Sequence, residues 1–254
     1  MELTMGFGPE DNLDRGSFLK FCKEAGFTSI ETYVTWKNFE PKPGKFDWNM
    51  YDEQVELFQE YGLKWVPFFI MGPWYATPSW FQESTQSAGY VCLEHGKENG
   101  VQSLWNPALP QHIDRCLAEF AQHFLSSEPQ RIESVLLGIT GDYGEAIYPV
   151  YGNWPDNYHT HPGYWCADPG AKQDLREKLK AKYGEIENLN IAWSTSFKDF
   201  AEIEPFLDEN RPNPQAWLDL NHWYLNAMTH WADLWLELAR KHMPQSQLYL
   251  CVGG

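Results

Sequence analysis

The run Leu63-Lys64-Trp65-Val66-Pro67-Phe68-Phe69-Ile70 carries the clearest evidence for the fold. It is apolar at nearly every position, which is typical of a parallel strand buried on both faces. Gly62 ends the helical pattern before it, and a stretch rich in Pro, Gly and Trp, residues 71–110, follows it. A buried strand with a helix before it and a long loop after it predicts an α/β fold around a parallel sheet.

The same alternation recurs along the whole chain. Apolar residues at helical spacing predict helices over residues 15–25, 51–61, 113–124, 171–183 and 214–243. Short apolar runs predict further strands over residues 3–7, 28–34, 132–139 and 247–252. No Gly-x-Gly-x-x-Gly follows the first strand, so a dinucleotide-binding fold lacks its usual signature.

Long loops follow the third and fourth predicted strands, at about 71–110 and 148–170. Enzymes with a (β/α)8 TIM-type barrel build their active sites from loops at this end of the strands. We therefore expect residues 1–254 to form a partial TIM-barrel catalytic domain containing about the first five of eight βα units. Since five units use all 254 residues, we expect a fragment of a longer barrel or a barrel completed by another copy.

Composition points to a neutral ligand. The net charge of −16 would repel nucleic acid and anionic membranes, and no apolar run is long enough to span a bilayer. Aromatic residues reach 16%, with 13 Trp, which suits stacking against sugar rings, although large cores also use Trp. A carbohydrate partner is expected, and a homo-oligomer is compatible with the sequence.

Cysteine usage and the start of the chain bear on the compartment. The five cysteines are scattered and form no Cys-x-x-Cys pair, which favours free thiols. The first residues have neither a basic nor an apolar segment of the kind found in signal peptides. We expect a cytoplasmic protein.

The candidate catalytic residues are Asp142 and Glu145, in the run Gly141-Asp142-Tyr143-Gly144-Glu145 just past the fourth predicted strand. Hydrolysis of a glycosidic bond needs two carboxyl groups, one that protonates the leaving oxygen and one that attacks or activates water. Glycine beside Asp142 lets the backbone turn sharply and approach a ligand. The alternative is that Asp142 caps a turn and Glu145 is a solvated loop residue.

Three segments carry a resemblance to a known family. The run Trp36-Lys37-Asn38-Phe39-Glu40-Pro41-Lys42-Pro43-Gly44-Lys45-Phe46-Asp47-Trp48 resembles W-x-x-x-E-P-x-P-G-x-F-D-[FW] of glycoside hydrolase family 42 β-galactosidases and their clan A relatives. Ala76-Thr77-Pro78-Ser79-Trp80-Phe81 is similar to its T-P-P-A-W-L. Residues 182–193, Lys-Tyr-Gly-Glu-Ile-Glu-Asn-Leu-Asn-Ile-Ala-Trp, are similar to its R-Y-G-T-L-E-A-L-N-x-A-W. Together the segments extend the resemblance over most of residues 28–254.

The resemblance implies a retaining glycoside hydrolase acting on β-linked sugars, with its acid/base after the fourth strand. It also implies a glutamate nucleophile on the seventh strand, beyond this chain. The family's Asn-Glu-Tyr-Gly is replaced here by Gly141-Asp142-Tyr143-Gly144, which aligns Asp142 with the acid/base glutamate. The same segment faintly resembles the G-E-L-x-Y-P-x-Y-P loop of β-amylases, whose Glu is the acid, and we again align Asp142 with it. Alternatively, Glu145 reaches into the cleft and Asp142 supports it.

The change from Asn-Glu to Gly-Asp leaves a rival interpretation, a catalytically inactive sugar-binding or scaffold barrel. A second rival is a metal-dependent barrel hydrolase with its metal at His159 or His161. We predict no metal and no cofactor, because two histidines separated by one residue on a loop are a weak metal signal. The cysteine cluster that binds zinc in the family is also missing, and only Cys166 falls in that insertion.

The candidate substrate-binding residues are mostly aromatic side chains on the loops after the strands, each of which is more often a packing residue. Glu31 joins them as the only acid at the centre of a strand, where a buried ion pair or a substrate contact is favoured over a nucleophile. The full set is Glu31, Trp36, Trp74, Trp80, Trp105, Tyr143, Tyr148, Trp154 and Trp165. Several aromatic rings on one rim would make a carbohydrate cleft.

Overall fold

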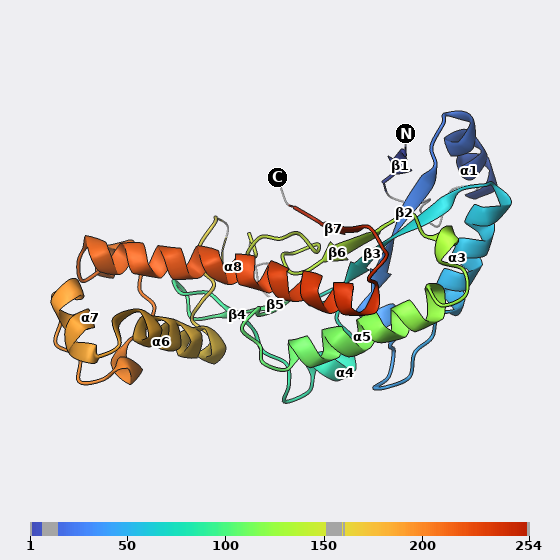
Figure 1. Cartoon of the computed structure of the whole chain (residues 1–254). Helices are drawn as coiled ribbons and strands as arrows, with labels where there is room; N and C mark the ends of the chain where they lie inside the picture. The colour runs from blue at the N-terminus through green and yellow to red at the C-terminus, as the bar shows by residue number, and fades with distance from the viewer. Residues whose placement is uncertain (1, 7–14, 151–158, 160, 253–254) are drawn as a thin grey trace.

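A five-stranded parallel sheet forms the centre of the molecule, as the computed structural model shows for residues 2–6, 15–150, 159 and 161–252 (Figure 1). The sheet order is β1-β2-β3-β6-β7, and each neighbouring pair is parallel. The strands are β1 (Thr4–Met5), β2 (Ser29–Thr35), β3 (Lys64–Ile70), β6 (Val135–Gly138) and β7 (Leu248–Leu250). The prediction of five parallel strands in this part of the chain is confirmed.

Helices connect the strands, and the five predicted helices are confirmed with ends shifted by a few residues. They are α1 (Arg15–Glu24), α3 (Asn49–Glu60), α5 (Leu109–Phe124), α6 (Pro169–Tyr183) and α8 (Pro214–His242). Shorter elements are α2 (Trp36–Phe39), α4 (Ser79–Gln82), α7 (Ile186–Trp193) and the 3-10 turns η1 (Pro129–Arg131), η2 (Phe200–Glu202) and η3 (Asp208–Asn210). Within the described residues, no helix is both long and apolar enough to cross a bilayer.

The stretch at 71–110, which we expected to be irregular, contains an antiparallel hairpin. Its strands are β4 (Gly89–Val91) and β5 (Glu98–Gln102), with an irregular register between them. Two glycines and several polar residues interrupt any alternation in these short strands, so the period-2 pattern that predicts a strand is missing. Backbone hydrogen bonds from Leu93 N to Tyr164 O (2.8 Å) and from Ala167 N to Val91 O (3.0 Å) hold the hairpin against the second long loop.

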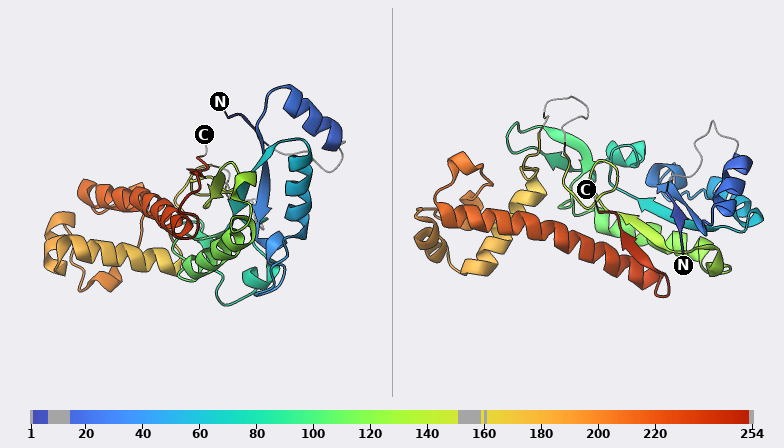
Figure 2. Two further views of the ribbon diagram at one scale, coloured as in Figure 1. Left: turned by 45° about the vertical axis from the view of Figure 1, so that its right-hand side comes forward. Right: turned by 90° about the horizontal axis from the view of Figure 1, so that it is seen from above.

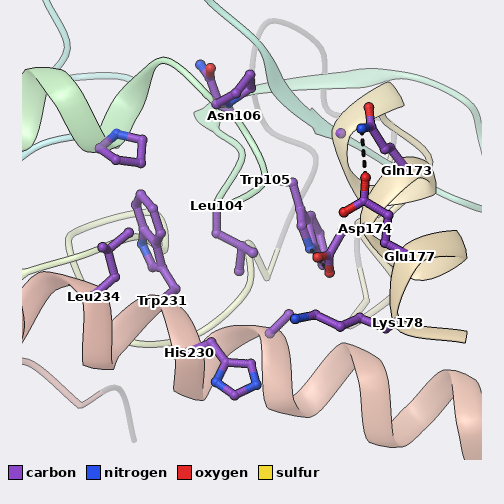
Figure 3. A pocket seen from close by; sticks show the side chains of 14 residues that line it. Leu104, Trp105, Asn106, Gln173, Asp174, Glu177, Lys178, His230, Trp231 and Leu234 are labelled. Atoms are coloured by element: carbon purple, nitrogen blue, oxygen red, sulfur yellow. Dashed lines mark hydrogen bonds between the residues drawn. The ribbon is translucent and has the colours of Figure 1, made fainter. Parts of the chain in front are cut away.

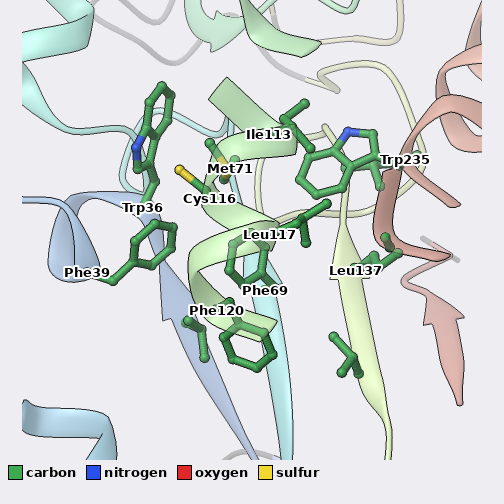
Figure 4. Packing of buried hydrophobic residues seen from close by; sticks show 14 of the residues in the cluster. Trp36, Phe39, Phe69, Met71, Ile113, Cys116, Leu117, Phe120, Leu137 and Trp235 are labelled. Carbon is green, nitrogen blue, oxygen red and sulfur yellow. The ribbon is translucent and has the colours of Figure 1, made fainter. Parts of the chain in front are cut away.

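One face of the sheet packs against the helices. Alternate residues of four adjacent strands, Val34, Phe69, Leu137 and Leu250, lie in register on this face. Figure 4 shows α5 running along the strands over β3, with β2 on one side and β6 on the other, and with Trp235 of α8 near β6. Alternate side chains of each strand point to this face, and side chains three and four positions apart on the helices point back at them. Their packing sets the helices as a layer on one side of the sheet.

The opposite face of the sheet, which we call the open face, holds a cross-strand row of Tyr33, Phe68, Leu136 and Tyr249. Tyr33 is 38% exposed and Tyr249 55% exposed, although both lie in the middle of strands. In the described part of the chain no further strand pairs with β1 or β7, so the sheet is open at both edges. A closed barrel would bury this face in its interior, and the structure is therefore the expected half-barrel.

A second hydrophobic cluster lies beside the sheet, where the N-terminal half of α8 extends past it to α6 and α7 (Figures 1 and 2). Asp219 of α8 is buried in this region and accepts hydrogen bonds from Lys182 Nζ (2.6 Å), Tyr183 OH (2.5 Å) and Trp193 Nε1 (2.8 Å). The segment 182–193, one of the three segments that carry the resemblance noted in the sequence, thus fixes the packing of α6 and α7 on α8.

Candidate active site

The loop after β6 turns sharply at two glycines. Gly141 has φ of +70° and Gly144 has φ of +106°, and Ile139 N donates to Gly144 O at 3.0 Å. A side chain at position 141 would bring its Cβ within 2.8 Å of both the carbonyl oxygen and Oε2 of Glu145. Only glycine allows this close approach, because a Cβ atom would overlap the Glu145 backbone.

The fold of this loop places Glu145 at the C-terminal edge of the sheet. Its Oε2 accepts a hydrogen bond from Tyr143 N at 2.9 Å. The next residue, Ala146, donates its N–H to Cys251 O at 2.8 Å and so attaches the loop to the end of β7. Glu145 is half-buried and lies between the ends of β6 and β7.

Three side chains, one on β2, one in the loop after β3 and one just after β7, lie within electrostatic range of Glu145. Burial raises the pKa of Tyr33, and the charges of Glu31 and Glu145 raise that pKa further. Burial also raises the pKa of Tyr75, with Tyr33 and Glu145 adding to it. The pKa of the Cys251 thiol is likewise raised by burial and then by Glu145. Glu145 therefore faces the open side of the sheet among neutral phenols and a neutral thiol.

Tyr33 and Tyr75 were not among the residues selected from the sequence. Tyr33 stands two positions after Glu31 on β2, and its ring lies 5.3 Å from that of Phe68. Tyr75 donates a hydrogen bond to Tyr143 O at 3.3 Å. The period-2 alternation in β2 could have identified Tyr33, whereas Tyr75 lies in a loop whose path no local pattern predicts.

Asp142 has a different environment from Glu145. It is half-buried, and its Oδ2 accepts a hydrogen bond from Val150 N at 3.2 Å. This bond closes a loop of residues 142–150 at the start of the second long insertion. Asp142 thus holds the shape of the loop that presents Glu145.

Of the predicted aromatic side chains that the structure describes, Tyr143 and Trp74 have the most open surface. Tyr143 is 65% exposed beside Tyr75, and Trp74 is 40% exposed after β3. Trp80 is half-buried, and its indole N–H donates to Glu40 O at 2.9 Å. Tyr143 lies in the loop of residues 139–150 that carries Asp142 and Glu145, which we call the acidic loop. It is therefore the ring best placed to contact a ligand at Glu145.

Trp36 belongs to the core instead of an open rim. It has no exposed surface, and its indole N–H donates to Glu40 Oε2 at 2.7 Å. Arg115 of α5 contacts both oxygens of Glu40 at 2.8 Å, and Gly44 N donates to Oε1 at 2.7 Å. The W-x-x-x-E-P-x-P-G segment therefore forms a buried, fully bonded carboxylate that joins β2 to α5.

Trp105 and Tyr148 pack behind the acidic loop. Tyr148 stacks on Tyr224 with 3.9 Å between ring centroids, and Trp105 stacks on Trp223 at 5.1 Å. The rings of Trp105 and Tyr148 both contact the ring of Tyr90. The Tyr90 hydroxyl lies 2.9 Å from Thr140 Oγ1 and so connects these rings to the loop. Trp165 has no exposed surface, so its ring is closed to a ligand. Trp154 lies outside the described residues.

Trp105 also lines a cavity of about 440 Å³ between the start of α5, α6 and α8. Figure 3 shows its ring beside Asp174 and facing the side of α8 that carries His230 and Trp231. Asp174 accepts hydrogen bonds from the indoles of Trp105 (3.2 Å) and Trp223 (2.7 Å). No residue of the loop 139–150 lines this cavity, so it is separate from the acidic site.

Glu31 lies lower on the open face of the sheet, opposite Val66 of β3. It lies four positions before the last residue of β2, or about 13 Å at about 3.3 Å per residue. It lines a hollow of about 320 Å³ together with Glu2, Glu133 and Tyr249. Burial raises the pKa of Glu31. Glu31 therefore lies toward the N-terminal end of the strands, away from the loop of residues 139–150.

His159 and His161 come close to each other, with 4.3 Å between their ring centroids. His159 also lies beside Cys92 and His95 of the β4–β5 hairpin, which the sequence analysis did not connect with it. These residues are the part of the described chain in which a metal could be held.

The open parallel sheet, its outer helices and the acidic loop at its C-terminal edge define half of a (β/α)8 barrel of the kind used by glycoside hydrolases. A family model described as "Beta-galactosidase" matches residues 12–98 and 110–250. The chain belongs to glycoside hydrolase family 42.

The curated relatives include beta-amylases and beta-galactosidases. A thermophilic beta-amylase of Thermoanaerobacterium thermosulfurigenes is 28% identical over 228 residues, covering 82% of this chain and 41% of the relative. A beta-galactosidase of Thermus thermophilus is 27% identical over 235 residues, covering 87% of this chain and 33% of the relative. The chain thus spans less than half the length of either relative.

Solved structures share the fold. The catalytic domain of a beta-amylase from Paenibacillus polymyxa superimposes with a TM-score of 0.82 at 24% identity, over 95% of this chain and 63% of that one. A beta-galactosidase from the psychrophilic Marinomonas ef1 gives a TM-score of 0.74 at 19% identity, over 98% of this chain and 37% of that one. At these identities the likeness concerns the fold.

Proposed function

We propose that this chain supplies the acid/base half of the active site of a retaining glycoside hydrolase, with a carbohydrate as its substrate. Family membership supports the reaction class, and the names of the relatives suggest β-galactosides first and α-glucans such as amylose second. In such a reaction one carboxylic acid protonates the glycosidic oxygen while a second carboxylate, about 5–5.5 Å away, attacks the sugar. The second group would come from a strand outside residues 1–254.

Within the loop, we assign the acid/base to Glu145 and a positioning role to Asp142. The observation that carries this assignment is the place of Glu145 at the C-terminal edge of β6, in electrostatic range of Tyr33, Tyr75 and Cys251 on the open face. Asp142 instead bonds to Val150 N within its own loop.

The β-amylase-like pattern supports the same choice once its register is corrected. Our alignment of its glutamate with Asp142 breaks the match of the following residues. Laid without a gap on Gly144-Glu145-Ala146-Ile147-Tyr148-Pro149, the pattern G-E-L-x-Y-P matches at Gly, Glu, Tyr and Pro. The acid of that pattern then falls on Glu145.

The test compares three amide variants in the protein as it occurs naturally. We expect Glu145→Gln to lower kcat on an alkyl β-D-galactoside by about 10²–10⁴-fold, the usual contribution of general acid catalysis. Asp142→Asn should cost about tenfold or less, because the amide can still accept from Val150 N. Glu187→Gln on the exposed face of α7 is the control and should leave kcat unchanged.

Three results would contradict the proposal. A larger loss in Asp142→Asn than in Glu145→Gln would exchange the two roles. Retained activity in both variants would remove the acid/base from this loop. A wild-type protein that binds galactosides but hydrolyses neither these nor amylose would favour the inactive sugar-binding barrel.

We also propose that the protein works in a reducing compartment such as the cytoplasm. None of the five cysteines forms a disulfide in the structure, and four of them are buried. Scattered free thiols are usual where glutathione and thioredoxin keep cysteines reduced.

A further inference from the structure

The tip of the β4–β5 hairpin and the second long loop bring three metal-binding side chains together. Cys92 Sγ lies 3.4 Å from His95 Nδ1 and 3.4 Å from His159 Nδ1, and the two Nδ1 atoms are 3.2 Å apart. The three atoms form a nearly equilateral triangle. His159 and Cys92 are buried, while His95 lies at the surface of the hairpin tip.

Hydrogen bonds alone cannot satisfy this triangle. A histidine Nδ1 either carries a hydrogen and donates, or carries a lone pair and accepts. If both nitrogens have the same form, their 3.2 Å contact is repulsive. If one donates and one accepts, the hydrogens of that ring and of Cys92 can serve only two of the three contacts. A cation that takes a lone pair from each atom would satisfy all three at once.

The dimensions agree with tetrahedral zinc. Bonds of about 2.3 Å to sulfur and about 2.0–2.1 Å to nitrogen give ligand–ligand edges of about 3.6 Å for S···N and about 3.3 Å for N···N. The corresponding distances here are 3.4 and 3.2 Å. Cys92 and His95 are separated by two residues, and this short spacing on a hairpin is common among structural zinc sites.

We propose that Cys92, His95 and His159 bind a structural zinc ion, with Glu94 as the fourth ligand. Glu94 Oε2 lies 3.9 Å from His159 Nδ1, and its Oε1 lies 3.8 Å from His95 Nε2, so the carboxylate lies beside the triangle and would reach the ion by rotation of its side chain. His161 Nε2, 3.5 Å from Glu94 Oε2, orients that carboxylate from outside. One thiolate and one carboxylate neutralise Zn²⁺ in this half-buried place.

The surrounding backbone is shaped to hold the ligands. Gly96, with φ of +64°, turns the chain so that its N–H donates to Cys92 O at 2.8 Å, which brings Cys92 and His95 to one side of the hairpin tip. Gly163 packs on the ring of His159, where a Cβ would lie 2.6 Å from the ring atoms. In the described chain Nε2 of His159 has no hydrogen-bond partner, so the ring's polar contacts run through Nδ1.

The site would join two insertions that are far apart in sequence. Cys92 and His159 are separated by 67 residues, one in the loop after β3 and the other in the loop after β6. A metal bond across this distance stabilises the folded state, because the unfolded chain does not hold the ligands together. The expected role is therefore structural, and it does not depend on the proposed hydrolase activity.

The direct test measures metal in the purified full chain by elemental analysis and then replaces zinc with Co²⁺. We expect about one zinc per chain, and an absorption band from thiolate-to-cobalt charge transfer that is lost in Cys92→Ser. His95→Asn and Glu94→Gln change the surface of the hairpin and should fold even if Cys92→Ser does not. Each should weaken zinc binding, and His95→Asn by more than about a hundredfold, since loss of an outer-shell partner alone costs up to that much.

Cys251→Ser is the matched control, since this thiol lies on the open face of the sheet, and it should keep full zinc binding. The proposal fails if the wild-type chain contains no zinc and binds added Co²⁺ without a thiolate band. It also fails if His95→Asn and Cys92→Ser bind zinc as tightly as the wild-type chain.

Discussion

At the scale of single residues, the acidic loop depends on backbone positions that only glycine fills easily. Gly141 allows the main chain and side chain of Glu145 to approach it closely, and Gly144 turns the chain back toward β6. These turns aim Glu145 at the open face while Asp142 closes the loop from the other side. The position of Glu145 is therefore set by the lack of side chains at Gly141 and Gly144 as much as by its own contacts.

Gly141→Ala should displace Glu145. The new Cβ meets backbone atoms of Glu145, and the residue must also keep φ near +70°. We expect a loss of about 1–3 kcal/mol in the free energy of unfolding and a fall in kcat of about 10²-fold. Gly184→Ala is the control, because Gly184 has φ of +74° with open space around it. Equal effects of both changes on kcat would show that the close approach at Gly141 has no role in positioning Glu145.

Glu40 gives the structure a pH dependence of known sign. Burial alone would raise the pKa of this carboxyl, but hydrogen bonds from Arg115, Trp36 and Gly44 outweigh burial and lower it. A lowered folded-state pKa means that Glu40 stabilises the fold above its unfolded pKa of about 4.3. The contribution is lost as pH falls through the folded-state value.

The measurement compares unfolding of the wild-type chain and Glu40→Gln between pH 7 and pH 3. We expect Glu40→Gln to cost about 1–3 kcal/mol at pH 7, the range for hydrogen bonds to a charged group. The difference between the two proteins should shrink as the pH falls below 4. A difference that stays constant across this range would mean that the Glu40 charge does not stabilise the fold.

At the scale of elements, the core between α5 and the sheet carries much of the stability. Phe120 of α5 is fully buried, with ring centroids 5.1–6.1 Å from those of Trp48, Trp65, Phe69 and Phe124. When one of these packed rings is removed, it leaves a cavity that the surrounding side chains fill only in part.

Phe120→Ala should therefore lower the free energy of unfolding by about 3–5 kcal/mol. Phe21→Ala on α1 is the matched control, because that ring is 59% exposed, and we expect a change within about 0.5 kcal/mol. Urea unfolding followed by tryptophan fluorescence measures both. Similar losses in the two variants would mean that burial at Phe120 contributes little.

The sequence predicts best those elements in which one hydrophobic pattern continues over enough residues to be recognised. Alternation identifies β2, apolar runs identify β3 and β6, and the 3.6-residue spacing of Trp217, Leu220, Tyr224 and Trp231 identifies α8. The β4–β5 hairpin and α7 were missed, because three to eight residues offer too few repeats of any pattern. Trp36 and Trp165 were considered possible sugar contacts because loop position was inferred, whereas burial depends on the packing of distant elements.

At the scale of the whole molecule, the half-barrel explains which parts of the site could be anticipated. Parallel strands bring their C-terminal ends to one edge, so the placement of the acidic loop there followed from the order of strands and helices. The approach of Tyr75 to Tyr143, and of Cys92 to His159, depends on how two long loops fold over that edge. Sequence separation of 67 or 68 residues hides such contacts from any local pattern.

The role of Glu145 is tested most directly by the dependence of hydrolysis on the leaving group. An acid that protonates the departing oxygen matters little for a dinitrophenol, which leaves without a proton, and greatly for a sugar or an alkyl alcohol. In the full-length protein we predict that Glu145→Gln hydrolyses a dinitrophenyl β-D-galactoside at nearly the wild-type rate of bond cleavage, while an alkyl galactoside reacts about 10²–10⁴-fold more slowly. An equal loss on both substrates would contradict the assignment of Glu145 as the acid.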